Sequence, residues 1–230
     1  MPLRNTAVLW VASVLLAACG APTVSDNPSP ATALRYVALG DSYTIGTSVE
    51  PEDCWPAQLV DRLGDGLVLS ANLAVNGFTT HDVIVHELPD LDAYTPDFVS
   101  LLIGVNDVVR GEPEATYREN VAFILDDLLG RLPPNRILIV ATPDYTLTPA
   151  GAAFPDAPGD RETIARFNEI LEAEASERGI AFVPEIYAIS QEAGSDPTMV
   201  ADDGLHPSAA QYALWVDAIE PVVAGLTNSP

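Results

Sequence analysis

Lysine is absent from the 230-residue chain, and all ten basic residues are arginine. Against them stand 33 acidic residues, which give a formal net charge of -23. A surface with this charge repels phosphate backbones and anionic lipid head groups. We therefore expect no nucleic-acid partner, and we expect any residence at a membrane to depend on an attached lipid.

The chain also lacks an apolar run long enough to span a bilayer. The N-terminal apolar run, residues 7–18, follows Arg4 and is shorter than the ~20 residues that a transmembrane helix needs. This pattern predicts a signal peptide over residues 1–18. Residues 16–19 read LAAC and resemble the lipobox of bacterial lipoproteins, in which Cys19 would carry lipid and become the mature N-terminus. The alternative is an ordinary cleaved signal beside an incidental cysteine. In both cases we expect an extracytoplasmic protein, either membrane-anchored or secreted.

Cysteine is scarce as well, with only Cys19 and Cys54 in the whole chain. If Cys19 carries lipid, Cys54 has no partner for an internal disulfide. Cys54 precedes Trp55 and has no cation beside it that would activate a thiolate. We interpret it as a small buried residue rather than a nucleophile.

Two segments follow the signal peptide. Residues 19–33 combine proline with Ser, Thr, Asn and Asp, can bury little apolar surface, and predict a flexible tether. Residues 34–227 fall within the usual size of one domain and show no internal repeat. We expect a single folded domain, which we take to be a monomer.

Strand and helix patterns alternate along this domain. Short apolar runs predict strands at residues 36–39, 67–75, 98–103, 137–141 and 180–183. Helical spacing predicts helices at residues 55–63, 80–88, 114–132, 161–178 and 208–226. Runs such as 99–103 and 137–140 are apolar on both faces, as a parallel sheet between two helical layers requires. The expected fold is therefore α/β: a three-layer α/β/α sandwich with a central five-stranded parallel sheet, flavodoxin-like.

Polar motifs follow these strands at the sheet edge where such folds bind ligands. The motifs are GDSY at residues 40–43, NG at 76–77, GVND at 104–107 and DGLHP at 203–207. Because the carboxyl ends of parallel strands share one edge, we expect the four motifs to converge.

The residue types in these motifs match the needs of acyl transfer. A serine hydroxyl becomes a nucleophile when an imidazole takes its proton and a carboxylate orients that imidazole. Ser42, His206 and Asp203 supply these three groups. An oxyanion needs donors, and the candidates are the Ser42 N–H, the backbone at Gly77 and the Asn106 amide. The sequence therefore predicts a triad with an oxyanion hole.

Other interpretations of these residues stay open. Ser42 could simply cap a helix. We assign Asp41 and Asp107 to positioning roles at the edge of the site, where each holds a turn or caps a helix. No histidine forms a helical metal motif with nearby Cys or Glu, so we expect metal-independent catalysis and no cofactor.

Three further features lie near the motifs. His81 and His86 fall on the helix after Gly77, and we expect both to be surface residues. Arg110 could meet an anionic substrate group or pair with one of the many acids. The proline-rich segment 142–160 predicts a long loop, which is either a binding wall or lid, or a surface excursion without a role.

The motifs together resemble the SGNH, or GDSL-type, serine hydrolases. Ser42, Gly77, Asn106 and His206 take the positions of the four naming residues, and the resemblance covers nearly all of the expected domain. Residues 36–55, 103–107 and 142–145 are also similar to bacterial lysophospholipase-like esterases. The resemblance implies broad tolerance of acyl esters and does not identify a substrate.

Three functions remain in view. The leading one is a serine esterase that hydrolyses carboxylic esters of lipid, aryl or acetylated carbohydrate type through an acyl-enzyme. The second is an acyltransferase or deacetylase that acts on envelope polysaccharide. The third is a binding lipoprotein without catalysis, which an intact triad argues against. The expected partner is a small-molecule, lipid or carbohydrate ester.

Overall fold

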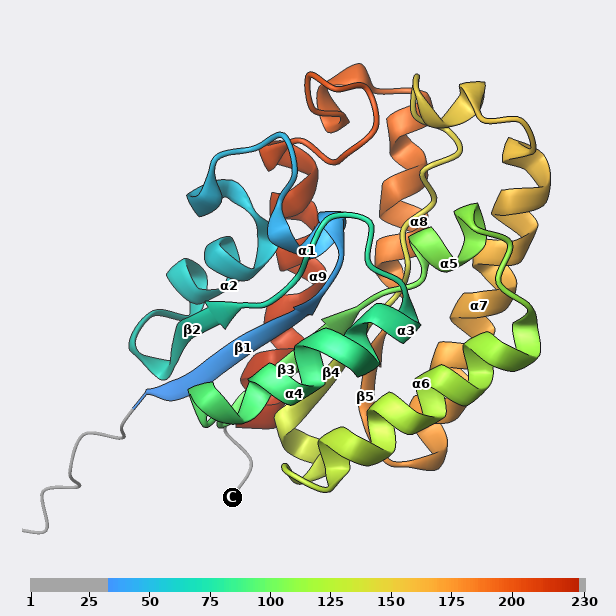
Figure 1. The fold of residues 1–230 in the computed structure, drawn as a ribbon. Helices are drawn as coiled ribbons and strands as arrows, with labels where there is room; N and C mark the ends of the chain where they lie inside the picture. Colours follow the sequence, from blue (N-terminus) through green and yellow to red (C-terminus); the bar gives the residue numbers. More distant parts are fainter. Residues whose placement is uncertain (1–32, 228–230) are drawn as a thin grey trace, which may run out of the picture. The chain divides into compact units, whose positions relative to one another are not determined.

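A parallel sheet of five strands forms the centre of the domain (Figure 1). The computed structural model describes residues 33–227, so the expected signal peptide, Cys19 and nearly all of the expected tether lie outside the described residues. The strands are β1 (Leu34–Gly40), β2 (Leu67–Asn72), β3 (Phe98–Leu102), β4 (Ile137–Val140) and β5 (Ala181–Val183). Their order is β2-β1-β3-β4-β5, the flavodoxin-like order, and every pair is parallel. The predicted fold is confirmed.

Helices cover both faces of the sheet. They are α1 (Ser42–Ile45), α2 (Trp55–Leu63), α3 (Thr80–Asp82), α4 (Leu88–Leu91), α5 (Val105–Val109), α6 (Glu114–Leu129), α7 (Ala157–Glu177), α8 (Glu185–Ser190) and α9 (Ala209–Thr227). On one face α2 packs against α9, and on the other α6 packs against α7 (Figure 1). The chain changes direction between β1 and β3, and ligands bind at such a switch point in open α/β sheets.

The core explains why β3 and β4 are apolar on both faces. Every residue of these two strands is buried, because helices lie above and below them. Ser100, the one polar member, shares a 2.6 Å hydrogen bond with the hydroxyl of Tyr36. Large side chains from the helical layers complete the packing, among them Trp55 of α2 and Trp215 of α9, both fully buried. The sheet is therefore a rigid platform for the residues at its edge.

Several elements differ from the predicted ones in extent. The helix expected at residues 80–88 runs through α3, a π-helical turn (Val83–Glu87) and α4. Helix α7 begins at Ala157, which shortens the loop expected at residues 142–160. Helices α5 and α8 were not predicted, because segments of five and six residues show too little periodicity.

Cys54 is a free, buried residue, and its thiol donates to the carbonyl of Pro51 at 3.1 Å. Burial raises the pKa of the Cys54 thiol, which disfavours a reactive thiolate. Within residues 33–227, no helix combines the length and apolar character that crossing a membrane requires.

Candidate active site

The turn after β1 presents Ser42 at the sheet edge. β1 ends at Gly40, whose φ of +148° and close neighbours exclude a side chain: a Cβ would lie 2.2 Å from the Leu102 carbonyl oxygen. Asp41 then caps α1, because its carboxylate accepts from the Tyr43 N–H at 3.0 Å. Ser42 is the first residue of α1, with 7% of its surface exposed. The capping role considered for Ser42 therefore belongs to Asp41.

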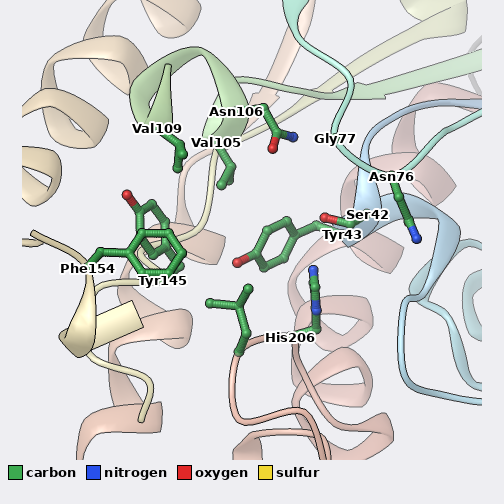
Figure 2. Close-up of a pocket in the computed structure, with 11 residues that line it drawn as sticks. Ser42, Tyr43, Asn76, Gly77, Val105, Asn106, Val109, Tyr145, Phe154 and His206 are labelled. Atoms are coloured by element: carbon green, nitrogen blue, oxygen red, sulfur yellow. The ribbon is translucent and has the colours of Figure 1, made fainter. Parts of the chain in front are cut away.

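Asp203 and His206 come from one short loop before α9. The His206 Nδ1 lies 2.6 Å from Asp203 Oδ2. Asp203 Oδ1 accepts the backbone N–H groups of Leu205 and His206 at 2.8 and 3.0 Å, which fixes the carboxylate to its own loop. A carboxylate beside Nδ1 keeps the proton there and leaves Nε2 as an acceptor. Figure 2 shows the His206 ring with one nitrogen pointing toward Ser42.

The charge on Asp203 is strongly stabilised. Burial alone raises the pKa of this carboxyl, but hydrogen bonds from His206, from the Leu205 N–H and from the Ser48 hydroxyl outweigh it and hold the pKa well below its usual range. Asp203 therefore stays ionised at neutral pH, where it can orient the imidazole. The Ser42 Oγ makes no hydrogen bond to any residue between 33 and 227, and in ligand-free sites such contacts commonly tighten only when substrate binds.

The candidate oxyanion donors lie around the same cavity. Neither the Ser42 N–H nor the Gly77 N–H donates to another described residue, so both are available to a ligand. The Asn106 amide differs, since its Nδ2 donates to the Phe78 carbonyl at 2.9 Å and to Asp41 Oδ2 at 3.2 Å. Two backbone donors are therefore free, and the third group already has acceptors.

A tight turn explains the glycine at position 77. The Phe78 N–H donates to the Val75 carbonyl at 3.2 Å, and Gly77 has a φ of +82° at the third position of this turn. Turns of type II need a positive φ there, which favours glycine. The Gly77 carbonyl accepts from the Arg110 guanidinium at 2.6 Å. Arg110 also lies 3.7 Å from Asp82, which supports the acid-pairing alternative for this residue.

Three buried carboxyls lie beneath the site. Burial raises the pKa of Asp41 to about 7 and that of Asp107 to about 6. Asp107 accepts from the Thr80 N–H at 3.0 Å and from its hydroxyl at 2.5 Å, and so it holds the first turn of α3. Burial also raises the pKa of Glu87 to about 9, and this carboxyl accepts from the Gly40 N–H at 2.9 Å. Each carboxyl thus fixes backbone next to a motif.

An apolar cavity of about 230 Å³ opens beside Ser42 (Figure 2). Its lining comes from all four motifs, from the end of α5 and from the loop after β4: Ser42, Tyr43, Asn76, Gly77, Val105, Asn106, Val109, Tyr145, Phe154, Leu205 and His206. The hydroxyl of Tyr43 is buried and has no hydrogen-bond partner among the described residues. The Tyr145 and Phe154 rings lie 5.3 Å apart and form the wall opposite Ser42. This placement favours the binding-wall interpretation of the loop.

The structure brings most of the predicted site residues together. Ser42, Gly77, Asn106 and His206 line one cavity, Asp203 contacts His206, and Asp41 contacts Asn106. His81 and His86 are exposed and do not line it. Among residues 33–227, no group of three or more His, Cys, Asp or Glu side chains is arranged to hold a metal ion.

Sequence reasoning missed residues that act through the tertiary structure. The Ser48 hydroxyl donates to Asp203, and the Thr47 hydroxyl donates to Asn76. The Glu87 carboxyl accepts from the backbone N–H of Gly40, in the turn before Ser42. Val109 and Leu205 complete the cavity. Leu205 lies within the DGLHP motif, whereas the positions of the other four residues carry no motif. Only the apolar type of Val109 and Leu205 could have suggested a pocket.

The fold and the motifs define an ester-hydrolysing enzyme of the α/β/α type. Residues 38–214 match the GDSL-like lipase/acylhydrolase family, and the chain belongs to this family. It is 26% identical over 178 residues to an arylesterase of Vibrio mimicus, covering 75% of this chain and 80% of the relative. It is 25% identical over 200 residues to a GDSL lipase of Mycobacterium tuberculosis, covering 81% and 80%.

Solved structures share the fold. An acetylxylan esterase from Geobacillus stearothermophilus superposes with a TM-score of 0.65 at 21% identity, covering 83% of this chain and 94% of that one. A structure described as TesA gives a TM-score of 0.66 at 23% identity, covering 84% and 99%. At these identities the likeness extends to the fold alone.

Proposed function

We propose that the protein is a serine esterase for short acyl or small aromatic carboxylic esters, with Ser42 as nucleophile, His206 as general base and Asp203 as the orienting carboxylate. The observation that carries this proposal is the 2.6 Å contact between Asp203 Oδ2 and His206 Nδ1, in a loop whose imidazole faces Ser42 across an apolar cavity. Structures of three variants of the acetylxylan esterase are described as those of catalytic mutants, and in them a serine, an aspartate or a histidine is replaced by alanine.

The reaction proceeds in two halves. Ser42 Oγ attacks the ester carbonyl carbon while its proton passes to His206 Nε2. The carbonyl oxygen becomes an oxyanion that accepts from the Ser42 and Gly77 N–H groups. The Asn106 amide gives up its longer hydrogen bond, the one to Asp41, and donates that N–H to the oxyanion instead. His206 then protonates the departing alcohol, which leaves an acyl-enzyme. A water molecule, deprotonated by His206, hydrolyses the acyl-enzyme and restores the Ser42 hydroxyl.

The size and lining of the cavity support small substrates. A cavity of about 230 Å³ is smaller than the ~300–1,000 Å³ of typical ligand pockets, which favours a small acyl group over a long lipid chain. Side chains such as Val105, Phe154 and Leu205 offer no strong polar partner, which suits an alkyl stub or a single ring.

Covalent labelling tests the nucleophile. We expect a fluorophosphonate probe to label the wild type, and Ser42→Ala to remove the label. His86→Ala, at an exposed position outside the cavity, is the control and should label like the wild type. Absence of labelling in folded wild-type protein would overturn the proposal. Rates on p-nitrophenyl esters from acetate to octanoate then test the pocket, and we expect the rate to fall as the chain lengthens.

A deacetylase acting on polysaccharide is the second candidate. The small cavity and the likeness to an acetylxylan esterase favour it. Release of acetate from acetylated xylan, measured with the wild type and Ser42→Ala, tests it. Release by the wild type alone would show that the enzyme deacetylates the polysaccharide. No release, together with rapid cleavage of p-nitrophenyl acetate, would favour simple esters.

We also propose that the enzyme works outside the cytoplasm, anchored through Cys19. The support is the order of residues 1–19, a short apolar run followed by the lipobox-like LAAC. Mass spectrometry of the mature N-terminus tests this proposal. A diacylglyceryl-modified Cys19 is the expected result, and an unmodified terminus elsewhere would exclude the anchor.

A further inference from the structure

The segment 46–48, directly after α1, has an unusual backbone. Gly46 ends the helix with a φ of +85°, and Ser48 has a φ of +69°. Among residues 33–227 only Ser48 and Thr95 combine a positive φ with a side chain. Such a conformation costs free energy for a residue with a Cβ and persists where the surroundings impose it. Ser48 is exposed, so core packing does not impose this conformation.

Ser48 is the third residue of a turn in which the Val49 N–H donates to the Gly46 carbonyl at 3.3 Å, and from this position its side chain reaches the acid of the proposed triad. The Ser48 hydroxyl donates to Asp203 Oδ2 at 2.7 Å. The same oxygen lies 2.6 Å from His206 Nδ1, while Oδ1 accepts two backbone N–H groups from its own loop. Among the described residues, Ser48 is therefore the single donor to this carboxylate that comes from the nucleophile side of the site. Its hydrogen bond is one of those that hold the pKa of Asp203 down.

The preceding residue makes an equivalent contact on the other side of the site. The Thr47 hydroxyl lies 2.6 Å from Asn76 Oδ1, to which it donates. Asn76 precedes Gly77 in the turn that carries a proposed oxyanion donor. Two consecutive hydroxyls thus connect the end of the nucleophile helix to the acid-base loop and to the oxyanion turn.

We infer that segment 46–48 is a positioning element for the reaction, in which the Ser48 hydroxyl holds the Asp203 carboxylate in place beside His206. The inference rests on the proposed Ser42 esterase function. Ser48 touches neither the cavity nor the reacting atoms, so it acts on the rate of the acyl-transfer steps and not on substrate affinity. A purely structural loop contact would instead change stability, and activity would follow stability.

Two variants of Ser48 separate these roles. Ser48→Ala and Ser48→Gly both remove the hydroxyl, but only glycine relieves the cost of a φ of +69°. We expect both to lower kcat on p-nitrophenyl acetate by the same factor, about tenfold, as for loss of one hydrogen bond to a charged group, with KM unchanged. We expect the melting temperature of Ser48→Gly to equal or exceed that of the wild type, and that of Ser48→Ala to be lower than that of Ser48→Gly.

Two further variants serve as controls, one that keeps the hydroxyl at position 48 and one that relieves a positive φ at another position. Ser48→Thr keeps the hydroxyl and adds a branched Cβ at positive φ, so it should lower the melting temperature and retain most of kcat. Thr95→Gly relieves the same kind of backbone strain at an exposed site outside the cavity, and its kcat should equal that of the wild type.

Opposite results overturn the inference. A wild-type kcat in Ser48→Gly would show that the hydroxyl has no positioning role, as would a kcat that follows the melting temperature across the Ala and Gly variants. A wild type that neither hydrolyses esters nor reacts with fluorophosphonate would instead contradict the proposed function. The two failures are therefore distinguishable in one set of proteins.

Discussion

The Asn106 amide donates to Asp41 Oδ2 at 3.2 Å, and this contact joins the residues that follow β1 and β3. Asp41 caps the nucleophile helix with its other oxygen, which accepts from the Tyr43 N–H. One buried carboxylate therefore orients two proposed parts of the site: the helix that begins at Ser42 and the amide of the oxyanion hole. The arrangement depends on Asp41 being ionised, although burial raises the pKa of this group to about 7.

Replacing Asp41 tests that dependence. Asp41→Asn keeps an acceptor for the Tyr43 N–H but places an amide where Asn106 needs a carboxylate, so we expect kcat on p-nitrophenyl acetate to fall about tenfold at pH 8. Wild-type activity should rise between about pH 6 and 8 as Asp41 ionises. The variant should lose the part of that rise due to Asp41. Identical pH profiles for the two proteins would contradict the role given to Asp41.

Gly77 and Gly111 form a matched pair for testing the oxyanion turn. Both have a positive φ, +82° and +69°, and a Cβ added at either position would meet no atom closer than 3.9 Å. Replacement by alanine should therefore cost about 1 kcal/mol of unfolding free energy at each site through the backbone alone. Gly77→Ala should in addition reduce kcat by about 100-fold, since it shifts a proposed oxyanion donor. Urea titration and steady-state kinetics measure the two effects, and equal kcat values in the two variants would exclude Gly77 from the oxyanion hole.

Phe154 limits the length of the proposed acyl pocket. Phe154→Ala removes a ring from the wall opposite Ser42, so the optimum on p-nitrophenyl esters should move to longer chains, with at least a severalfold gain for hexanoate relative to acetate. Phe123→Ala serves as the control, because this ring is 54% exposed on α6 and outside the cavity. An unchanged chain-length profile in Phe154→Ala would mean that the acyl group binds elsewhere.

Glu87 should make the protein less stable as pH rises. Burial raises the pKa of its carboxyl to about 9, whereas in the unfolded chain the group loses its proton near its ordinary value of 4.5. Between these values the folded state holds more protons than the unfolded state, so the free energy of unfolding falls with increasing pH. Asp41 and Asp107 act in the same direction over a narrower range.

Thermal unfolding at several pH values measures this effect. We expect the wild-type melting temperature to drop between pH 5 and pH 8, and Glu87→Gln to reduce the drop by on the order of 5 °C. Glu172→Gln, at an exposed position of α7, should leave the drop as it is. A drop of equal size in all three proteins would show that Glu87 is ionised in the folded state.

Much of the fold could be predicted from local pattern. Apolar runs located all five strands, and apolar runs buried on both faces indicated a parallel sheet between two layers, as β3 and β4 show. The site motifs could be predicted for a related reason: each follows a strand, and strand ends of a parallel sheet meet at one edge. Short helices such as α5 and α8 could not, because five or six residues do not establish a period.

The sequence by itself determined which chemical groups the site contains: the Ser42 hydroxyl, the His206 imidazole, the Asp203 carboxylate and the glycine that its turn requires at position 77. Only the tertiary structure decided how these groups are held. Ser48 lies 155 positions before Asp203, and Glu87 lies 47 positions after Gly40, yet each forms a hydrogen bond to that distant partner. No local pattern encodes such contacts, because they depend on the crossovers that bring strand ends together and on the burial that follows.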